Sequence, residues 1–95
     1  MVQRFHPGNE FRITDNVKGG GVDYRPYLER HLAGDWGDVE SEDAEVNNRA
    51  VAHSERGERG SYLTSTYNTP FGQLWIVTRI HDYTLVMTDA DMNPA

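Results

Sequence analysis

Apolar positions recur at helical spacing in the first half of the chain. Between Asp23 and Gly34 they fall three and four residues apart and define one buried stripe, made of Tyr24, Tyr27, Leu28, His31 and Leu32. Asp23 is a suitable N-cap, Pro26 falls in the first turn, where no intrahelical N–H is needed, and Gly34 suits the C′ position. The pattern predicts a helix over this segment.

A second helix is predicted to begin with Ser41 as its cap and to fray in "SERGERG", residues 54–60. Glu42 and Asp43 fall in its first turn, where the helix dipole favours anions. Its apolar content is low, so two inward stripes stay open. One consists of Asn47, Ala50, Val51 and Ser54, and the other of Val46, Ala50 and His53.

Alternation of apolar and polar residues predicts strands elsewhere. "FRIT", residues 11–14, is a short strand, and the glycines of "DNVKGGG" (15–21) end it because they cost too much backbone entropy inside a regular element. The last third predicts three strands, "SYLTSTY" (61–67), "QLWIVT" (73–78) and "YTLVMT" (83–88), with a five-residue hairpin loop, "NTPFG", after the first.

The faces of these strands follow from the same alternation. We expect Leu74, Ile76, Leu85 and Met87 to point one way and Trp75 and Val77 the other. Because "LWIV" is apolar on both faces, its strand is predicted to be central, with helices covering one side of the sheet.

The order of these elements predicts an α+β fold in two layers: one short strand, two helices, then a three-stranded antiparallel meander. Residues 1–95 are long enough for one domain with a single core. Within that domain we expect residues 1–10, which carry the turn signal Pro7-Gly8-Asn9, to be loose.

Composition narrows the classes of function. The net charge is −6, from 15 acidic and 9 basic residues, which argues against direct nucleic-acid binding and fits docking onto a basic protein. The chain has no cysteine, which excludes disulfides, thiolate nucleophiles and cysteine zinc sites. No apolar run is long enough to cross a membrane and the N-terminus lacks a signal-peptide core, so we expect a cytoplasmic protein without a membrane partner.

An acidic block carries six carboxylates in eleven residues with no basic residue among them: Asp35, Asp38, Glu40, Glu42, Asp43 and Glu45. One interpretation is a solvated loop with favourable charge at a helix N-terminus. The other is a partner-binding patch that imitates phosphates and occupies a basic nucleic-acid channel. Together with Trp36 as an exposed anchor, these six are the predicted partner-binding residues.

Basic side chains follow the acidic block: Arg49, His53, Arg56 and Arg59. They either neutralise it through pairs four residues apart, such as Glu45 with Arg49 and Glu55 with Arg59, or form a separate contact site.

The segment from His31 to Gly37 also has two interpretations. "GDWG" (34–37) is a rigid helix-ending corner with a buried indole, or it presents Trp36 to a partner. His31 is a packed side chain bonded to a carbonyl or to the Asp35 carboxylate, or it is a general base. A metal site from His31, Asp35 and either Glu45 or His53 is conceivable, but no HxxxH or HExxH spacing occurs. We therefore predict no catalytic residue, no metal and no cofactor.

The chain resembles a family of small proteins encoded on bacterial plasmids, phages and integrated elements, usually labelled "plasmid-related" or type I restriction subunit M. The resemblance spans residues 23–88 and rests on Arg30-His31, Gly34-Asp35-Trp36-Gly37, Val39, Glu42-Asp43, Asn47, Ser65, Tyr67, Leu74-Trp75-Ile76-Val77-Thr78 and Thr84. It implies a mobile-element accessory protein and no established reaction. The restriction-subunit label does not suit this chain, which has no cofactor-binding glycine loop and no room for a methyltransferase fold.

These observations favour an acidic protein that acts by binding another protein. The specific hypothesis is an anti-defence inhibitor, of the anti-CRISPR or anti-restriction kind, that docks on a basic nucleic-acid-binding surface. The alternatives are a homodimeric interaction module joined through the sheet edge, and a small hydrolase or nuclease that uses His31 and Asp35.

Overall fold

A computed structural model describes residues 3–58 and 60–92 and shows a mixed four-stranded sheet in the order β1-β4-β3-β2. β2 (Tyr62–Thr69), β3 (Gly72–Arg79) and β4 (Tyr83–Thr88) form the antiparallel meander, and β1 (Glu10–Ile13) adds to β4 in parallel. The α+β class is confirmed, and the short first strand completes the sheet as one of its edges.

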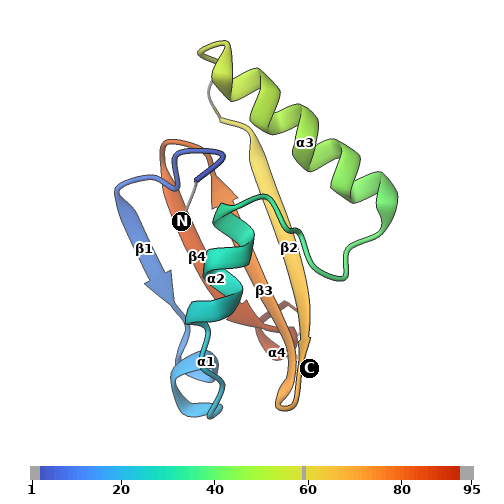
Figure 1. Ribbon diagram of the computed structural model, residues 1–95. Helices are drawn as coiled ribbons and strands as arrows, with labels where there is room; N and C mark the ends of the chain where they lie inside the picture. Colours follow the sequence, from blue (N-terminus) through green and yellow to red (C-terminus); the bar gives the residue numbers. More distant parts are fainter. Residues whose placement is uncertain (1–2, 59, 93–95) are drawn as a thin grey trace.

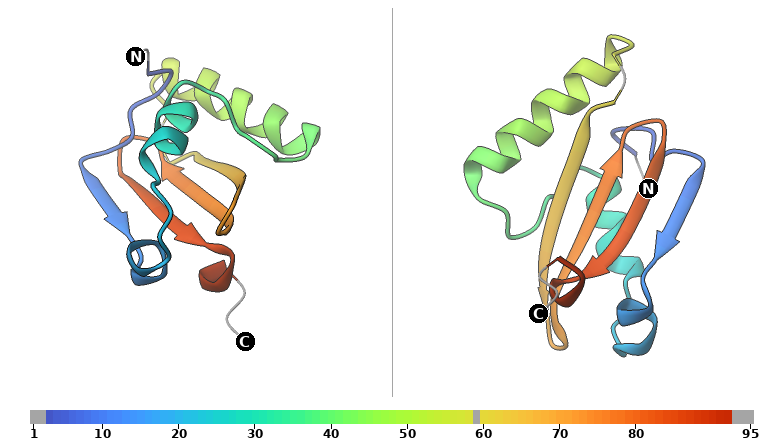
Figure 2. Two further views of the ribbon diagram at one scale, coloured as in Figure 1. Left: turned by 60° about the horizontal axis from the view of Figure 1, so that its bottom comes forward. Right: turned by 180° about the vertical axis from the view of Figure 1, so that it is seen from behind.

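Three of the four described helices lie on one face of this sheet or along one edge (Figure 1). α1 (Asp15–Gly19) and α2 (Arg25–Leu32) cover the inner face, and α3 (Ser41–Glu55) runs beside the edge strand β2. Seen from behind, the outer face is open except at one end, where α4 (Asp89–Met92) lies (Figure 2). The expectation of helices on one side of a central β3 is therefore confirmed.

The core lies between the inner face and the helices in two adjoining clusters. One holds Phe5, Leu32, Trp36, Val51, Leu63 and Ile80. The other holds Val17, Tyr67, Leu74, Ile76 and Val86. The partly buried Leu28 of α2 packs against both clusters and so joins them.

Both predicted caps are displaced by one residue. Tyr24 occupies the N-cap position of α2, although the Asp23 carboxylate still accepts a hydrogen bond from the Arg25 amide at 3.1 Å. Glu40 occupies the N-cap position of α3, without a side-chain cap bond, and Ser41 is the first helical residue. Gly34, with φ of +88°, ends α2 as predicted.

For α3 the structure selects the first of the two stripes. Asn47 and Val51 are buried, whereas Val46 is 53% exposed. This explains the low apolar content of α3, because one of its two buried residues, Asn47, is polar.

The first strand ends before "DNVKGGG", as expected, but this segment contains α1, which was not expected and whose Val17 is buried in the core. Two other expectations about the strands are wrong. The hairpin loop is Pro70-Phe71 alone, because β2 and β3 pair as far as Thr69 and Gly72. Leu85 and Met87 share the outer face with Val77 and Trp75, to which they lie directly opposite.

The N-terminal segment is not loose over residues 3–10. Phe5 is buried, the Arg4 amide donates to the Leu32 carbonyl at 2.9 Å, and the His81 amide donates to the His6 carbonyl at 3.0 Å. These bonds fasten the segment to α2 and to the β3–β4 turn. Residues 1–2 lie outside the described residues.

Candidate functional site

His31 lies in a buried chain of hydrogen bonds that crosses the inner face. Its Nδ1 lies 2.5 Å from the Ser65 hydroxyl and its Nε2 lies 2.9 Å from the Thr78 hydroxyl. Thr78 in turn bonds Thr84 at 2.8 Å, and Thr84 donates to the Pro7 carbonyl at 2.8 Å. These hydrogen bonds thus connect α2 to three strands and to the N-terminal segment.

The direction of these bonds fixes the tautomer of His31. A carbonyl only accepts, so Thr84 donates to Pro7, Thr78 donates to Thr84, and Thr78 must accept from His31 Nε2–H. Nδ1 is then the acceptor for the Ser65 hydroxyl. Burial lowers the pKa of His31 to about 3, which keeps the ring neutral and this arrangement intact.

The chemistry of a serine–histidine pair needs a substrate, and this pair has no access to one. His31 and Ser65 have no exposed surface, and the bonds of both His31 nitrogens lead to hydroxyls of the core. Neither of the partners expected for a packed His31, a carbonyl or the Asp35 carboxylate, is bonded to it: both ring nitrogens meet hydroxyls, and the Asp35 carboxylate pairs with Arg30 at 2.7 Å. The structure does not bring His31 and Asp35 together as a catalytic pair.

The segment from Gly34 to Gly37 forms the rigid corner that one interpretation predicted. Asp35 bonds Arg30 and also accepts from the Gly37 amide at 3.2 Å, and the Arg30 bond is the main reason why the pKa of Asp35 is lowered. Trp36 is 5% exposed, and its Nε1–H donates to Asn48 at 3.1 Å. The hypothesis of Trp36 as an exposed anchor is wrong, since its indole is buried in the core.

Gly37 allows this corner to lie against β2. It has φ of +74°, and a Cβ there would collide with the Thr66 carbonyl and the Tyr67 ring. Close by, the Tyr67 hydroxyl donates to the Asp35 carbonyl at 2.6 Å, and burial raises the pKa of Tyr67 to about 12. The corner is therefore bonded to α2 through Arg30 and to β2 through Tyr67.

The outer edge of β2 is closed by other parts of the chain. The Trp36 carbonyl and the Asp38 amide bond the two backbone groups of Thr66. The Asn47 side chain does the same at Thr64, donating to its carbonyl at 2.8 Å and accepting from its amide at 3.2 Å. Since these groups are occupied, β2 does not offer an open edge to which a second copy can add a strand, and a homodimer stays a prediction.

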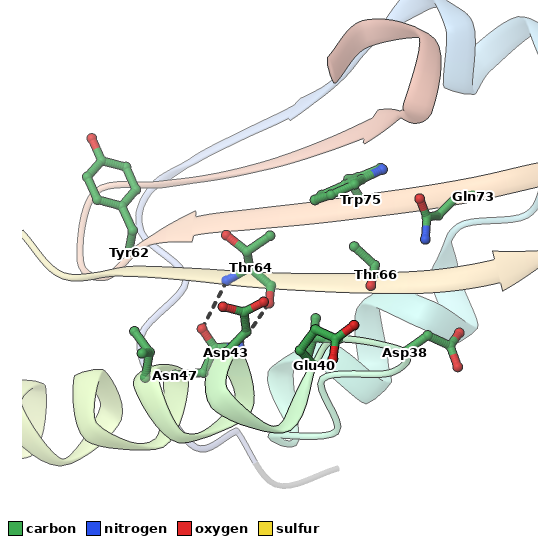
Figure 3. A pocket seen from close by; sticks show the side chains of 11 residues that line it. Asp38, Glu40, Asp43, Asn47, Tyr62, Thr64, Thr66, Gln73 and Trp75 are labelled. Atoms are coloured by element: carbon green, nitrogen blue, oxygen red, sulfur yellow. Dashed lines mark hydrogen bonds between the residues drawn. The ribbon is translucent and has the colours of Figure 1, made fainter. Parts of the chain in front are cut away.

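Part of the acidic block meets the outer face of the sheet in a hollow of about 500 Å³, which we call the α3 groove (Figure 3). Its helix side consists of Asp38, Val39, Glu40, Asp43, Val46 and Asn47. Its sheet side consists of Tyr62, Thr64, Thr66, Gln73 and Trp75. Of the predicted partner-binding residues, the structure therefore brings three into one groove: Asp38, Glu40 and Asp43.

Most of the acidic block is not neutralised. Glu40, Glu42, Asp43 and Glu45 make no ion pair within residues 3–58 and 60–92, and the predicted pair of Glu45 with Arg49 is not formed. Asp38 accepts a hydrogen bond from the Asn68 amide at 2.9 Å. Asp35 is paired with Arg30 at the corner.

The predicted basic site is only partly present. Arg49 and His53 line a second hollow of about 440 Å³ that adjoins the α3 groove through Val46 and Tyr62. His53 and Arg56 both lie within ion-pair distance of the Glu58 carboxylate, at 3.0 and 3.8 Å. Arg59, and with it the predicted pair with Glu55, lies outside the described residues.

Sequence reasoning missed the sheet side of the α3 groove. The alternating pattern placed Trp75 on the face opposite Leu74 and Ile76, which is correct, but gave no sign that α3 would lie beside that face. Tyr62, which is 51% exposed, also lines this side of the groove.

Two further observations limit the site. Within the described part of the chain, no group of three or more histidine, aspartate or glutamate residues is placed to hold a metal ion, so His31, Asp35, Glu45 and His53 are not brought together. None of the described helices has the length and apolar content needed to cross a membrane.

No protein-family model matches the chain, and no curated protein or solved structure is significantly similar to it. The resemblance to plasmid-related proteins therefore stays a prediction. Most of its polar residues have structural roles here, since they build the buried hydrogen-bond chain, the corner or the β2 edge: Arg30, His31, Asp35, Asn47, Ser65, Tyr67, Thr78 and Thr84. Because these residues make structural contacts, the α3 groove is the better candidate for a functional site.

Proposed function

We propose that the protein acts by binding a partner protein with a basic surface, and that the α3 groove is the binding site. The observation that carries this proposal is the meeting of Asp38, Glu40 and Asp43 with the apolar surface of Trp75 in one hollow. A patch that combines unpaired charge with a partly exposed aromatic ring is suited to protein recognition.

The two kinds of surface have separate tasks in this proposal. The net charge of −6 and the unpaired carboxylates attract a cationic surface over a distance and speed its encounter. Trp75 and Tyr62, on the sheet side of the groove, then supply the close contact that slows dissociation. Trp75 takes the part that Trp36, buried in the core, cannot take.

In its more specific form the proposal is an anti-defence inhibitor. A row of carboxylates can occupy a surface built to hold phosphates, so the partner would be a nuclease complex of a restriction or CRISPR system whose nucleic-acid site is blocked. The likeness of the sequence to mobile-element proteins and the acidic groove support this form.

Binding of an oligoarginine peptide, followed by fluorescence anisotropy, tests the groove directly. Glu40→Lys with Asp43→Lys should weaken binding by at least about tenfold, because both side chains line the groove. Binding to the wild type should also weaken as salt is raised.

The matched control is Glu42→Lys with Glu45→Lys, on the same helix but outside the groove. Each double variant changes the net charge from −6 to −2, since two charges of −1 become +1. Equal losses in the two variants would contradict the proposal, because they would show attraction to overall charge and no role for the groove.

A further inference from the structure

The outer face of the sheet carries an apolar cluster, which is open except towards the end of the sheet where α4 lies (Figure 2). It consists of Trp75 and Val77 on β3 and their direct neighbours Met87 and Leu85 on β4, and we call it the open-face cluster. All four side chains are half-buried. In an antiparallel sheet the face turned away from the core is normally polar, so a compact apolar block there indicates a contact surface.

The open-face cluster is continuous with the α3 groove, because Trp75 belongs to both. The two together form a floor and a wall. The floor is the apolar outer face, and the wall is α3 with the carboxylates of Glu40 and Asp43 (Figures 2 and 3).

Charge is unequal on the two sides of this floor. On the α3 side, Glu40 and Asp43 have no cationic partner among the residues that the structure describes. Elsewhere around this floor Arg12 pairs with Glu10 at 2.9 Å and Arg79 pairs with Asp82 at 3.4 Å, while Asp91 accepts hydrogen bonds from Thr14 and Asn16 at 2.7 and 2.8 Å. A ligand that complements this surface needs an apolar stripe and cations along one flank.

The dimensions of the cluster suit a helix. It extends over two adjacent strands, about 5 Å apart, and over two residue steps along each, about 7 Å. A helix about 10 Å in diameter covers such a block with a single apolar stripe. An added strand is excluded at the neighbouring edge, where Asn47 occupies the backbone of β2.

We propose that the open-face cluster and the α3 groove together bind an amphipathic helix of the partner, with its apolar stripe on Trp75, Val77, Leu85 and Met87 and its lysines or arginines beside Glu40 and Asp43. This inference rests on the proposed function and specifies the chemistry of the partner. An anionic membrane and a second copy of this chain fit less well, because both would bring negative charge towards the acidic wall.

Three peptides of equal charge test the proposal by fluorescence anisotropy on the full chain. One is an amphipathic lysine–leucine helix of about 18 residues, or five turns. The second has the same composition in an order without an apolar stripe, and the third is oligolysine. The amphipathic peptide should bind at least about tenfold more tightly than the other two.

Variants then locate the contact. Val77→Thr with Leu85→Thr should remove that preference, because threonine suits a strand but weakens the apolar floor. Phe71→Ser is the matched control, since Phe71 is 68% exposed at the tip of the hairpin, away from the cluster. In the wild type, the methyl NMR signals of Val77 and Leu85 should shift on addition of the amphipathic peptide, which tests the contact without any substitution.

The outcomes separate the two proposals. If the three peptides bind alike and the methyl signals do not move, the helix inference is wrong, although the groove stands if Glu40→Lys with Asp43→Lys still weakens oligolysine. If none binds, both fail. If light scattering shows self-association that Val77→Thr with Leu85→Thr abolishes, a second copy covers the face and the inference is overturned.

Discussion

His31 shows how a residue with catalytic potential becomes part of a core. Both ring nitrogens are occupied by hydroxyls, so the neutral ring is buried without an unmet hydrogen bond. Because its folded-state pKa of about 3 lies below the ordinary value of 6.5, the unfolded chain binds the proton more readily between these values. The stability that neutral His31 contributes is therefore complete above about pH 6.5 and is lost as the pH falls towards 3.

Replacement of His31 by Gln should lower the free energy of unfolding near neutral pH by about 2–4 kcal/mol, since two buried bonds lose their geometry. Gln does not titrate, so the difference from the wild type should shrink as the pH is lowered from about 6.5 to 4. Urea unfolding at several pH values measures this. His53→Gln, at an exposed position, is the control and should change stability little; a difference for His31→Gln that does not vary with pH would contradict the assignment.

At the residue scale, the sequence predicted which side chains are buried better than it predicted their hydrogen-bond partners. The helical spacing placed His31 on the buried stripe, because a period along one element is visible in the sequence. Its bonding partners are Ser65 and Thr78, which lie 34 and 47 residues away on separate strands. Which strand residue faces a given helix depends on how the layers pack, so Asp35, close in the sequence, was the wrong choice.

At the scale of elements, the feature that decides how this sheet meets other molecules is the closed edge of β2. The strand pattern alone predicted an edge that was open to pairing. The closure depends on Gly37 approaching Thr66 and on Asn47 turning from α3 towards Thr64. Both are contacts between elements, so the hydrophobic pattern that located β2 and α3 could not reveal them.

Replacement of Asn47 by Ala should expose the amide and carbonyl of Thr64 at the edge of β2. We expect a loss of about 1–3 kcal/mol in the free energy of unfolding, because two partly buried backbone groups lose their partner. Hydrogen exchange should speed up at the Thr64 amide more than elsewhere in β2, and the variant should self-associate more readily. Asn68→Ala, an exposed substitution on the same strand, is the control; unchanged exchange at Thr64 would show that Asn47 does not protect the edge.

At the scale of the whole molecule, the charge of the chain is distributed unevenly. Polar residues of the resemblance motif stabilise the interior and the corner, whereas Glu40, Glu42, Asp43 and Glu45, which make no ion pair within the described parts of the chain, lie at the N-cap and in the first turns of α3. Composition predicted the acidic character and the spacing predicted the block. Neither predicted that Glu40 and Asp43 would share a groove with Trp75 while Glu42 and Glu45 would not, since that depends on the rotation of α3 against β2.

This difference within the acidic block allows the anti-defence hypothesis to be tested in cells. Bacteria that carry one defined restriction or CRISPR system, and that express the chain, should be plated with a phage which that system targets. If the groove blocks the nucleic-acid site of the defence complex, the wild type should raise the plating efficiency and Glu40→Lys with Asp43→Lys should abolish the increase. Glu42→Lys with Glu45→Lys has the same net charge and should keep most of the increase in plating efficiency.

No increase with the wild type across a panel of both kinds of system would contradict the anti-defence form, while binding of oligoarginine to the groove would remain as a separate result. An increase that both double variants lose equally would assign the effect to overall charge and not to the surface between α3 and the sheet.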